Sequence, residues 1–80
     1  MRYPDGQDVR VGDKVRLGAD TEGVVVCSMD TGEYSQEHPE AQWGYLKKGV
    51  MVDFPKNYGL IHYPDKLEED LVLLARAEQT

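Results

Sequence analysis

The feature that most constrains the fold is a valine-rich run at residues 23–29, with the sequence GVVVCSM. Its apolar residues are nearly continuous, and β-branched valine favours extended backbone over helix. A short run of this kind, with polar turn residues before it, is typical of a central strand that is covered on both faces. The chain is therefore expected to build a sheet around this segment.

Several other segments predict strands that could pair with this run. Apolar residues alternate with polar ones on both sides of a bend at Gly12-Asp13. Such alternation is typical of a strand with one solvent-exposed face. A glycine after Lys47-Lys48 predicts a hairpin turn. The predicted strands are residues 9–17 with a bend or bulge at Gly12-Asp13, 23–29, 43–46, 50–54 and 60–63, with polar turns at 18–23 and 55–59.

The segment 67–77 fits two structures. Leu67, Leu71 and Leu74 have helical spacing, whereas Leu71 and Leu73 alternate as in a strand. Three consecutive acids at 68–70 would suit the first turn of a helix. A small sheet needs a closing strand, however, so a turn followed by a strand at about 71–76 is the favoured interpretation.

Short strands separated by glycine-containing turns predict a mainly β fold, a small antiparallel barrel of about five strands in one domain (1–80). Residues 11–17 (VGDKVRL), a glycine-containing turn and residues 23–26 (GVVV) resemble the opening hairpin of SH3-like barrels, including the KOW type. That resemblance implies an SH3-like fold and, in KOW domains, contact with RNA or protein. The turn here carries Asp20 and Glu22 where a nucleic-acid reader would need Lys or Arg, so we carry over the fold and not the RNA role.

A long acidic loop at 29–46 separates two of the predicted strands. Connections of this length with no structure of their own are usually functional or disordered, and aromatic residues favour the first option. Trp and Tyr are enriched at binding hot spots, and carboxylates around them would guide a basic partner. Trp43 could instead cap the core, an alternative that the sequence leaves open. The candidate binding residues are Asp30, Glu33, Tyr34, Glu37, Glu40, Trp43 and Tyr45.

The remaining side chains predict no catalytic site and no cofactor or metal. Cys27 follows three valines, where a thiol behaves as a small hydrophobe and not as a nucleophile. His38 and His62 are far apart and fit no zinc spacing, and His62 is expected to be a half-buried strand residue that donates to a backbone carbonyl. Phosphate-binding glycine motifs do not occur. We therefore expect a protein that is not an enzyme.

The formal net charge of −6 favours a basic protein partner and makes nucleic-acid binding unlikely. The polar residues 1–6 do not resemble a signal peptide and no apolar run is long enough to cross a bilayer, so a cytoplasmic location is expected. Small size, acidity and the loop together resemble small acidic immunity proteins of bacterial polymorphic toxin systems, which implies a toxin domain as the partner. The alternative is a KOW-like accessory domain that contacts RNA or the transcription and translation machinery through Arg10, Lys14 and Arg16. The sequence does not reveal the oligomeric state.

Overall fold

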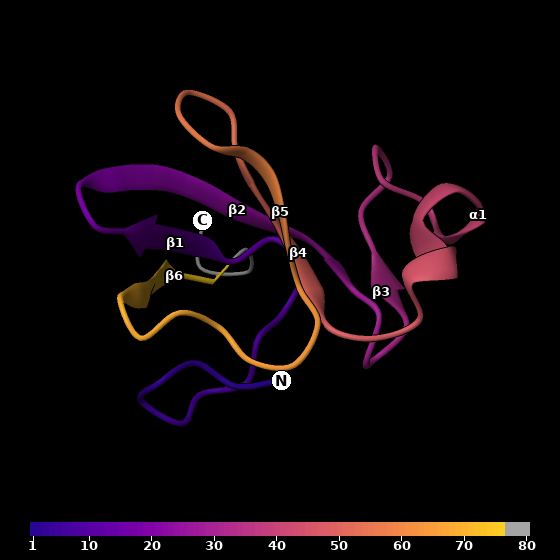
Figure 1. Cartoon of the computed structure of the whole chain (residues 1–80), viewed down its shortest axis with the longest axis horizontal. Coiled ribbons are helices and arrows are strands. Elements are labelled where there is room, and N and C mark those ends of the chain that lie inside the picture. The colour runs from indigo at the N-terminus through magenta and orange to yellow at the C-terminus, as the bar shows by residue number, and fades with distance from the viewer. Residues whose placement is uncertain (77–80) are drawn as a thin grey trace.

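The computed structural model describes residues 1–76, and the last residue of the predicted segment 67–77 lies outside the described part. The described chain is mainly β, as predicted, with six antiparallel strands in one sheet (Figure 1). The elements are β1 (Lys14–Leu17), β2 (Asp20–Ser28), β3 (Glu33–Tyr34), α1 (Glu40–Trp43), the 3-10 turn η1 (Gly44–Leu46), β4 (Val50–Phe54), β5 (Gly59–Tyr63) and β6 (Leu71–Ala75).

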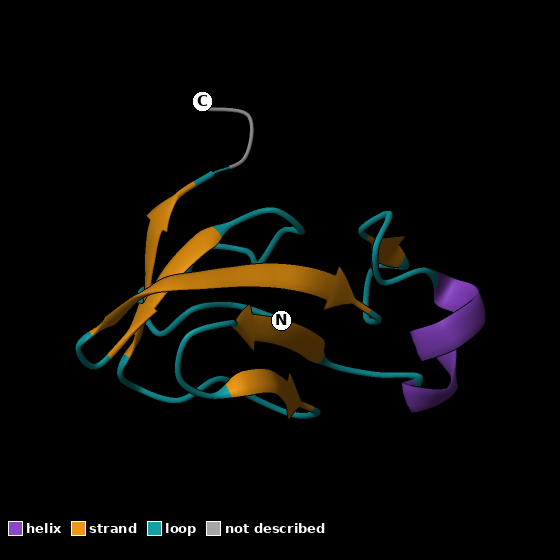
Figure 2. Cartoon of the chain, turned by 90° about the horizontal axis from the view of Figure 1, so that it is seen from above, coloured by secondary structure: helices purple, strands orange, loops and turns teal. Residues whose placement is uncertain are grey.

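The strand order in the sheet is β5-β4-β2-β1-β6, and β3 pairs with the end of β2. The long β2 therefore lies at the centre, as its valine-rich sequence predicts. Among the described residues β5 and β6, the two ends of this order, do not pair, so the sheet curls without closing (Figure 2). Residues 67–70 turn into β6, which confirms the strand interpretation of that segment.

Two apolar clusters cover the two faces of β2. Val25 points into the main core, where the alternate β4 residues Val50, Val52 and Phe54 are fully buried. A register shift in the pairing of β2 with β4, between Val25 and Cys27, marks a local irregularity of the sheet. Val26, Cys27, Met29 and Met51 form the second cluster, on the other face. The prediction that both faces of this strand are covered is confirmed.

Two strand predictions are wrong, the first of them in part. Residues 9–11 form no strand, although Val9 is buried in the main core, and the N-terminal segment makes only an isolated bridge between Arg2 and Asp8. Residues 43–46 belong to the helical turns α1 and η1, because the amides of Gln42 and Trp43 both donate to the carbonyl of Pro39. The long loop is also more ordered than expected, since it contains β3, α1 and η1. The turn at 18–23 is shorter than predicted, because β2 begins at residue 20.

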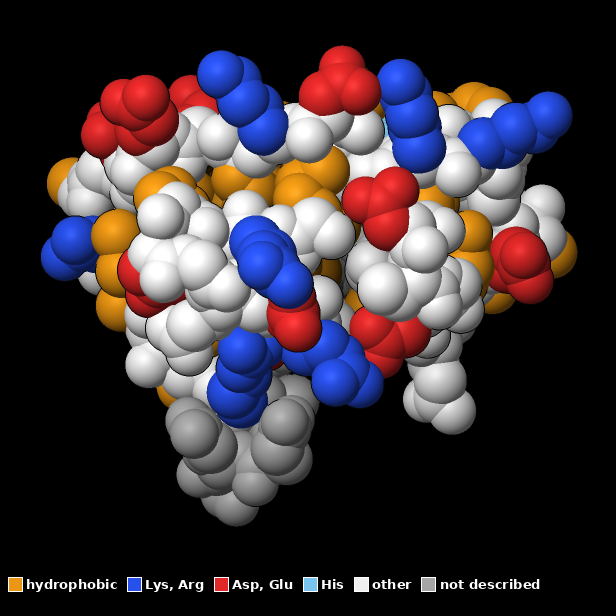
Figure 3. All heavy atoms as spheres, turned by 90° about the horizontal axis from the view of Figure 1, so that it is seen from below, with side chains coloured by type: hydrophobic (Ala, Val, Ile, Leu, Met, Phe, Trp, Pro, Cys, Tyr) orange, Lys and Arg blue, Asp and Glu red, His pale blue; other side chains and the backbone are white. Residues whose placement is uncertain are grey.

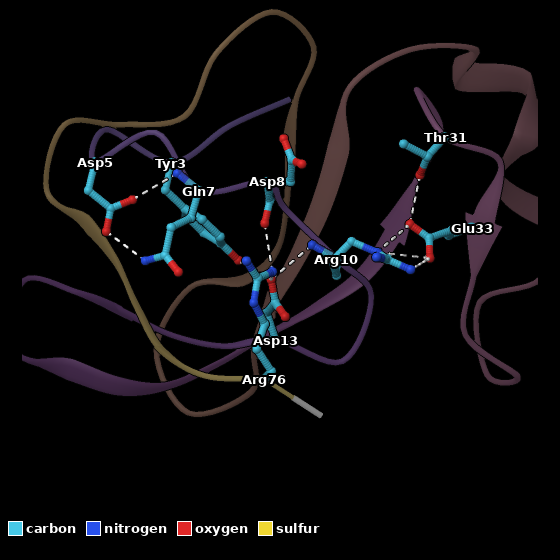
Figure 4. Close-up of polar contacts among 9 residues, drawn as sticks. All are labelled: Tyr3, Asp5, Gln7, Asp8, Arg10, Asp13, Thr31, Glu33 and Arg76. Carbon is cyan, nitrogen blue, oxygen red and sulfur yellow. Dashed lines mark hydrogen bonds and ion pairs between the residues drawn. The ribbon is translucent and has the colours of Figure 1, made fainter. Parts of the chain in front are cut away.

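A polar clasp ties both ends of the described chain to the start of β1. The Asp13 side chain is fully buried, and its Oδ2 accepts hydrogen bonds from the Tyr3 hydroxyl (2.6 Å), the Arg10 amide (2.8 Å) and Arg76 Nη1 (3.0 Å) (Figure 4). Arg76 also donates to the carbonyl of Asp8. The clasp thus fastens the N-terminal segment and the end of β6 to the sheet.

Candidate functional site

Residues 29–46, called the acidic lobe below, project from one end of the sheet. In Figures 1 and 2 α1 lies at the right end of the molecule, and β1 and β6 lie toward the left. The first strand of the lobe is β3, which pairs with the last residues of β2: Cys27 opposes Tyr34, and Ser28 opposes Glu33. The lobe is therefore built directly onto the central strand.

Apolar side chains anchor the lobe to the outer face of the sheet. Tyr34, Trp43 and Leu46 are partly buried and pack against the second cluster. The Cys27 thiol donates to the carbonyl of His38 at 3.4 Å, and the His38 and Trp43 rings lie 6.1 Å apart between centroids. Trp43 therefore caps a small core, the alternative that the sequence left open, and within residues 1–76 its buried Nε1 has no hydrogen-bond partner.

Two of the predicted binding carboxylates have partners inside the molecule. Both carboxylate oxygens of Glu33 accept hydrogen bonds from the Arg10 guanidinium at 3.0–3.3 Å. Thr31 Oγ1 donates a hydrogen bond to Glu33 Oε1 at 2.9 Å. The hydrogen bonds from Arg10 are the main reason that the pKa of Glu33 lies below its usual range. Asp30 Oδ1 accepts the Gly49 amide at 2.9 Å, and Oδ2 lies 3.7 Å from the Met1 ammonium group. Both carboxylates hold the lobe in place.

Three other predicted residues are exposed and uncommitted. Glu37 and Glu40 make no ion pair and no side-chain hydrogen bond within the described part of the chain, and Tyr45 is 69% exposed. The pKa of Tyr34 is raised by partial burial and then by the negative charge of Glu40. Carboxylates on the same lobe as an exposed aromatic ring offer charge and contact area to a cationic surface. Of the seven predicted residues, these three are the ones a partner can reach without dismantling the lobe.

The cations of the alternative interpretation differ in their surroundings. Arg10 lies on Glu33, whereas Lys14 and Arg16 are exposed on the outer face of β1. Lys47 follows the lobe directly, is exposed, and has a left-handed backbone with φ of 67°. Lys47 was not singled out from the sequence, although its place directly after the lobe could be read there.

A cleft of about 490 Å³ separates the N-terminal segment from the turn between β2 and β3, on the face shown in Figure 3. Among its charged groups, Arg10 bonds Glu33 across the cleft (Figure 4). Asp8 pairs at 3.1 Å with Arg2, which is not one of the lining residues. No sequence signal predicts this cleft, because its two walls lie more than twenty residues apart. The lining residues are Met1, Asp8, Val9, Arg10, Thr31 and Glu33.

The predicted burial of Cys27 and the predicted strand position and backbone hydrogen bond of His62 are confirmed. Cys27 is fully buried, and burial raises the pKa of its thiol, so the nucleophilic thiolate is disfavoured. His62 lies half-buried in β5, and its Nε2 donates to the carbonyl of Lys48 at 2.9 Å. Across residues 1–76 no group of three or more His, Cys, Asp or Glu side chains is placed to hold a metal ion.

Comparisons with models of protein families, with curated protein sequences and with solved structures found no match for this chain. In the described part of the chain no helix has the length and apolar character needed to cross a membrane.

Proposed function

We propose that this chain is a non-enzymatic binding module whose acidic lobe docks on a basic protein. The observation that carries the proposal is that some side chains of the lobe are anchored to the sheet while others are exposed. Trp43, Tyr34, Asp30 and Glu33 fix its position, while Glu37, Glu40 and Tyr45 stay exposed. A surface that is held rigid before binding loses less conformational entropy when a partner arrives.

The chemistry of the three exposed residues specifies the kind of partner. Two free carboxylates attract a cationic surface and raise the rate of encounter, in line with the net charge of −6. The exposed Tyr45 ring supplies the rigid, partly apolar contact that is frequent at interface hot spots. The partner is therefore a protein with a cluster of Lys or Arg around an apolar or cationic pocket that accepts an aromatic ring.

More specifically, we propose that the partner is a toxin domain and that the chain is its bacterial, cytoplasmic immunity protein. Toxins that cleave nucleic acids need basic clefts, and an acidic lobe of this size could occupy such a cleft as a mimic of the substrate. The scaffold is then a small all-β support of the SH3-like class, a proposal that the antiparallel pairing of β1 with β2 supports.

The test compares two charge reversals that have the same effect on net charge. The double variant Glu37→Lys with Glu40→Lys alters the lobe, and Glu69→Lys with Asp70→Lys alters exposed acids outside the lobe that make no ion pair within residues 1–76. Immobilised wild-type chain should retain a basic protein from bacterial lysate. The lobe variant should lose it, the control variant should keep it, and co-expression of the wild type should restore growth of cells that make the captured protein.

Two results would count against this function. Equal loss of the captured protein from both variants would mean that only overall charge matters. Salt-sensitive retention of RNA, with no basic protein retained, would favour the KOW-like alternative.

A further inference from the structure

The outer face of β1 and β6, called the β1–β6 face below, combines exposed apolar side chains with free cations. Val72 is 37% exposed and Leu74 is 47% exposed on β6. The β1 residue Arg16 opposes Val72, and Lys14 opposes Ala75, one position beyond Leu74. Neither Lys14 nor Arg16 makes an ion pair or side-chain hydrogen bond within the described residues. Exposed aliphatic residues beside unpaired cations suit a partner that offers carboxylates and an apolar ring.

A surface with those properties occurs on the same chain. The acidic lobe presents Glu37 and Glu40 without ion pairs and the Tyr45 ring at 69% exposure. Two anions and one aromatic ring on the lobe thus match two cations and two aliphatic side chains on the β1–β6 face.

The two surfaces cannot meet within one molecule. The lobe and the β1–β6 face lie toward opposite ends of the long axis in Figures 1 and 2, and that axis extends 32 Å. Both sets of charges can therefore be neutralised together only between molecules.

We propose that the β1–β6 face of one copy binds the acidic lobe of a second copy. The contact joins two different patches, so it is heterologous and generates head-to-tail rings or chains. It requires no other protein and is independent of the proposed docking on a basic partner. If both occur, the second copy and the basic partner compete for Glu37, Glu40 and Tyr45.

The contact is weak, for two reasons. The patches are small, and exposed ion pairs contribute little each. Every copy also carries a net charge of −6, which opposes association at long range. Self-association is therefore expected at high protein concentration and should diminish when salt screens the lobe–face pairs.

Sedimentation velocity of the whole chain over a wide concentration range at low salt tests the proposal. The wild type should show a mass that rises with concentration. Lys14→Glu with Arg16→Glu, and separately Glu37→Lys with Glu40→Lys, should each raise the dissociation constant at least about tenfold. The second variant is decisive, because it reduces the magnitude of the net negative charge from −6 to −2 (each exchange adds two positive charges). It therefore weakens long-range repulsion while it removes the local ion pairs.

Mixing the two variants provides a complementation test. The acidic lobe of the first variant meets the unaltered cations of the second, and the new anions of the first meet the new lysines of the second. The mixture should associate although each variant alone does not. Leu74→Ser, which changes no charge, should also weaken association, and the control Glu69→Lys with Asp70→Lys should not.

Three outcomes would overturn the proposal. These are a wild type that stays monomeric at every concentration, variants that associate like the wild type, and a mixture that shows no gain over its components.

Discussion

The buried carboxylate of Asp13 gives the sharpest prediction about stability. Asp13→Ala removes the acceptor for the Tyr3 hydroxyl, the Arg10 amide and Arg76, and the Asp13 side chain is 0% exposed. Hydrogen bonds to charged groups contribute about 1.5–3 kcal/mol each, and removing one partner from a buried charge pair costs about 3–5 kcal/mol. One offset applies, because Asp13 Oδ1 has no hydrogen-bond partner within residues 1–76 and its burial cost disappears with it.

The expected loss is therefore about 3 kcal/mol, the lower end of that range. A domain of this size has a total stability of roughly 4–12 kcal/mol, so the variant should keep roughly 1–9 kcal/mol and its urea midpoint should fall clearly. Urea denaturation followed by circular dichroism measures the change. Asp8→Ala is the matched control, because its carboxylate pairs with Arg2 at the exposed surface and should contribute less than about 1 kcal/mol.

A double-mutant cycle with Tyr3→Phe separates the clasp from general packing. Tyr3 and Asp13 should show a coupling energy of about 1.5–3 kcal/mol, since their side chains meet at 2.6 Å in the interior. Additive effects of the two substitutions, or a loss below about 1 kcal/mol for Asp13→Ala, would refute the clasp as a stabilising device.

Three further predictions concern stability. Gly49→Ala should lower the free energy of unfolding in urea by at least about 2 kcal/mol, because φ is 87° and the added Cβ would collide with the Tyr63 carbonyl. The control Gly18→Ala, with φ of 60° and open space around it, should cost about half as much, and equal costs would contradict the steric explanation. Lys47→Asn should leave the melting temperature unchanged or slightly raised, since Asn tolerates the left-handed backbone at this exposed site, and a drop of several degrees would refute this. Stability should fall as pH rises above about 10, the ordinary pKa of tyrosine, because burial raises the pKa of Tyr3 and of Tyr63 and the folded chain keeps protons that the unfolded chain releases. In urea denaturation at pH about 8–11, Tyr3→Phe with Tyr63→Phe should flatten this decline, and an unchanged slope would contradict the prediction.

The strands were predictable where alternation and burial agree. Residues 14–17 and 50–54 each place alternate apolar side chains in the main core, and the strand choice for β6 follows the same pattern. The helical turn that contains Trp43 was misassigned because four residues show no helical period. Pro39 before Glu40 was the available signal for a helix start, and the apolar residues at 43–46 obscured it.

Residue type alone could not divide the candidate site into anchors and free groups. Glu33 and Glu37 are the same residue in the same acidic segment, yet only Glu33 faces Arg10, which lies 23 positions earlier in the chain. Asp13 likewise appears as an ordinary turn residue after Gly12, and its burial depends on Tyr3 and Arg76. Such pairings depend on tertiary structure and leave no local pattern.

A nuclear magnetic resonance titration tests directly whether the exposed side chains of the acidic lobe form a docking face for cations. The ¹⁵N–¹H spectrum of the whole chain is recorded while nona-arginine is added at low salt. The largest shifts should fall on residues 37–45 and should disappear in the variant Glu37→Lys with Glu40→Lys. Shifts centred on residues 68–70, or spread evenly over all exposed acids, would contradict the claim.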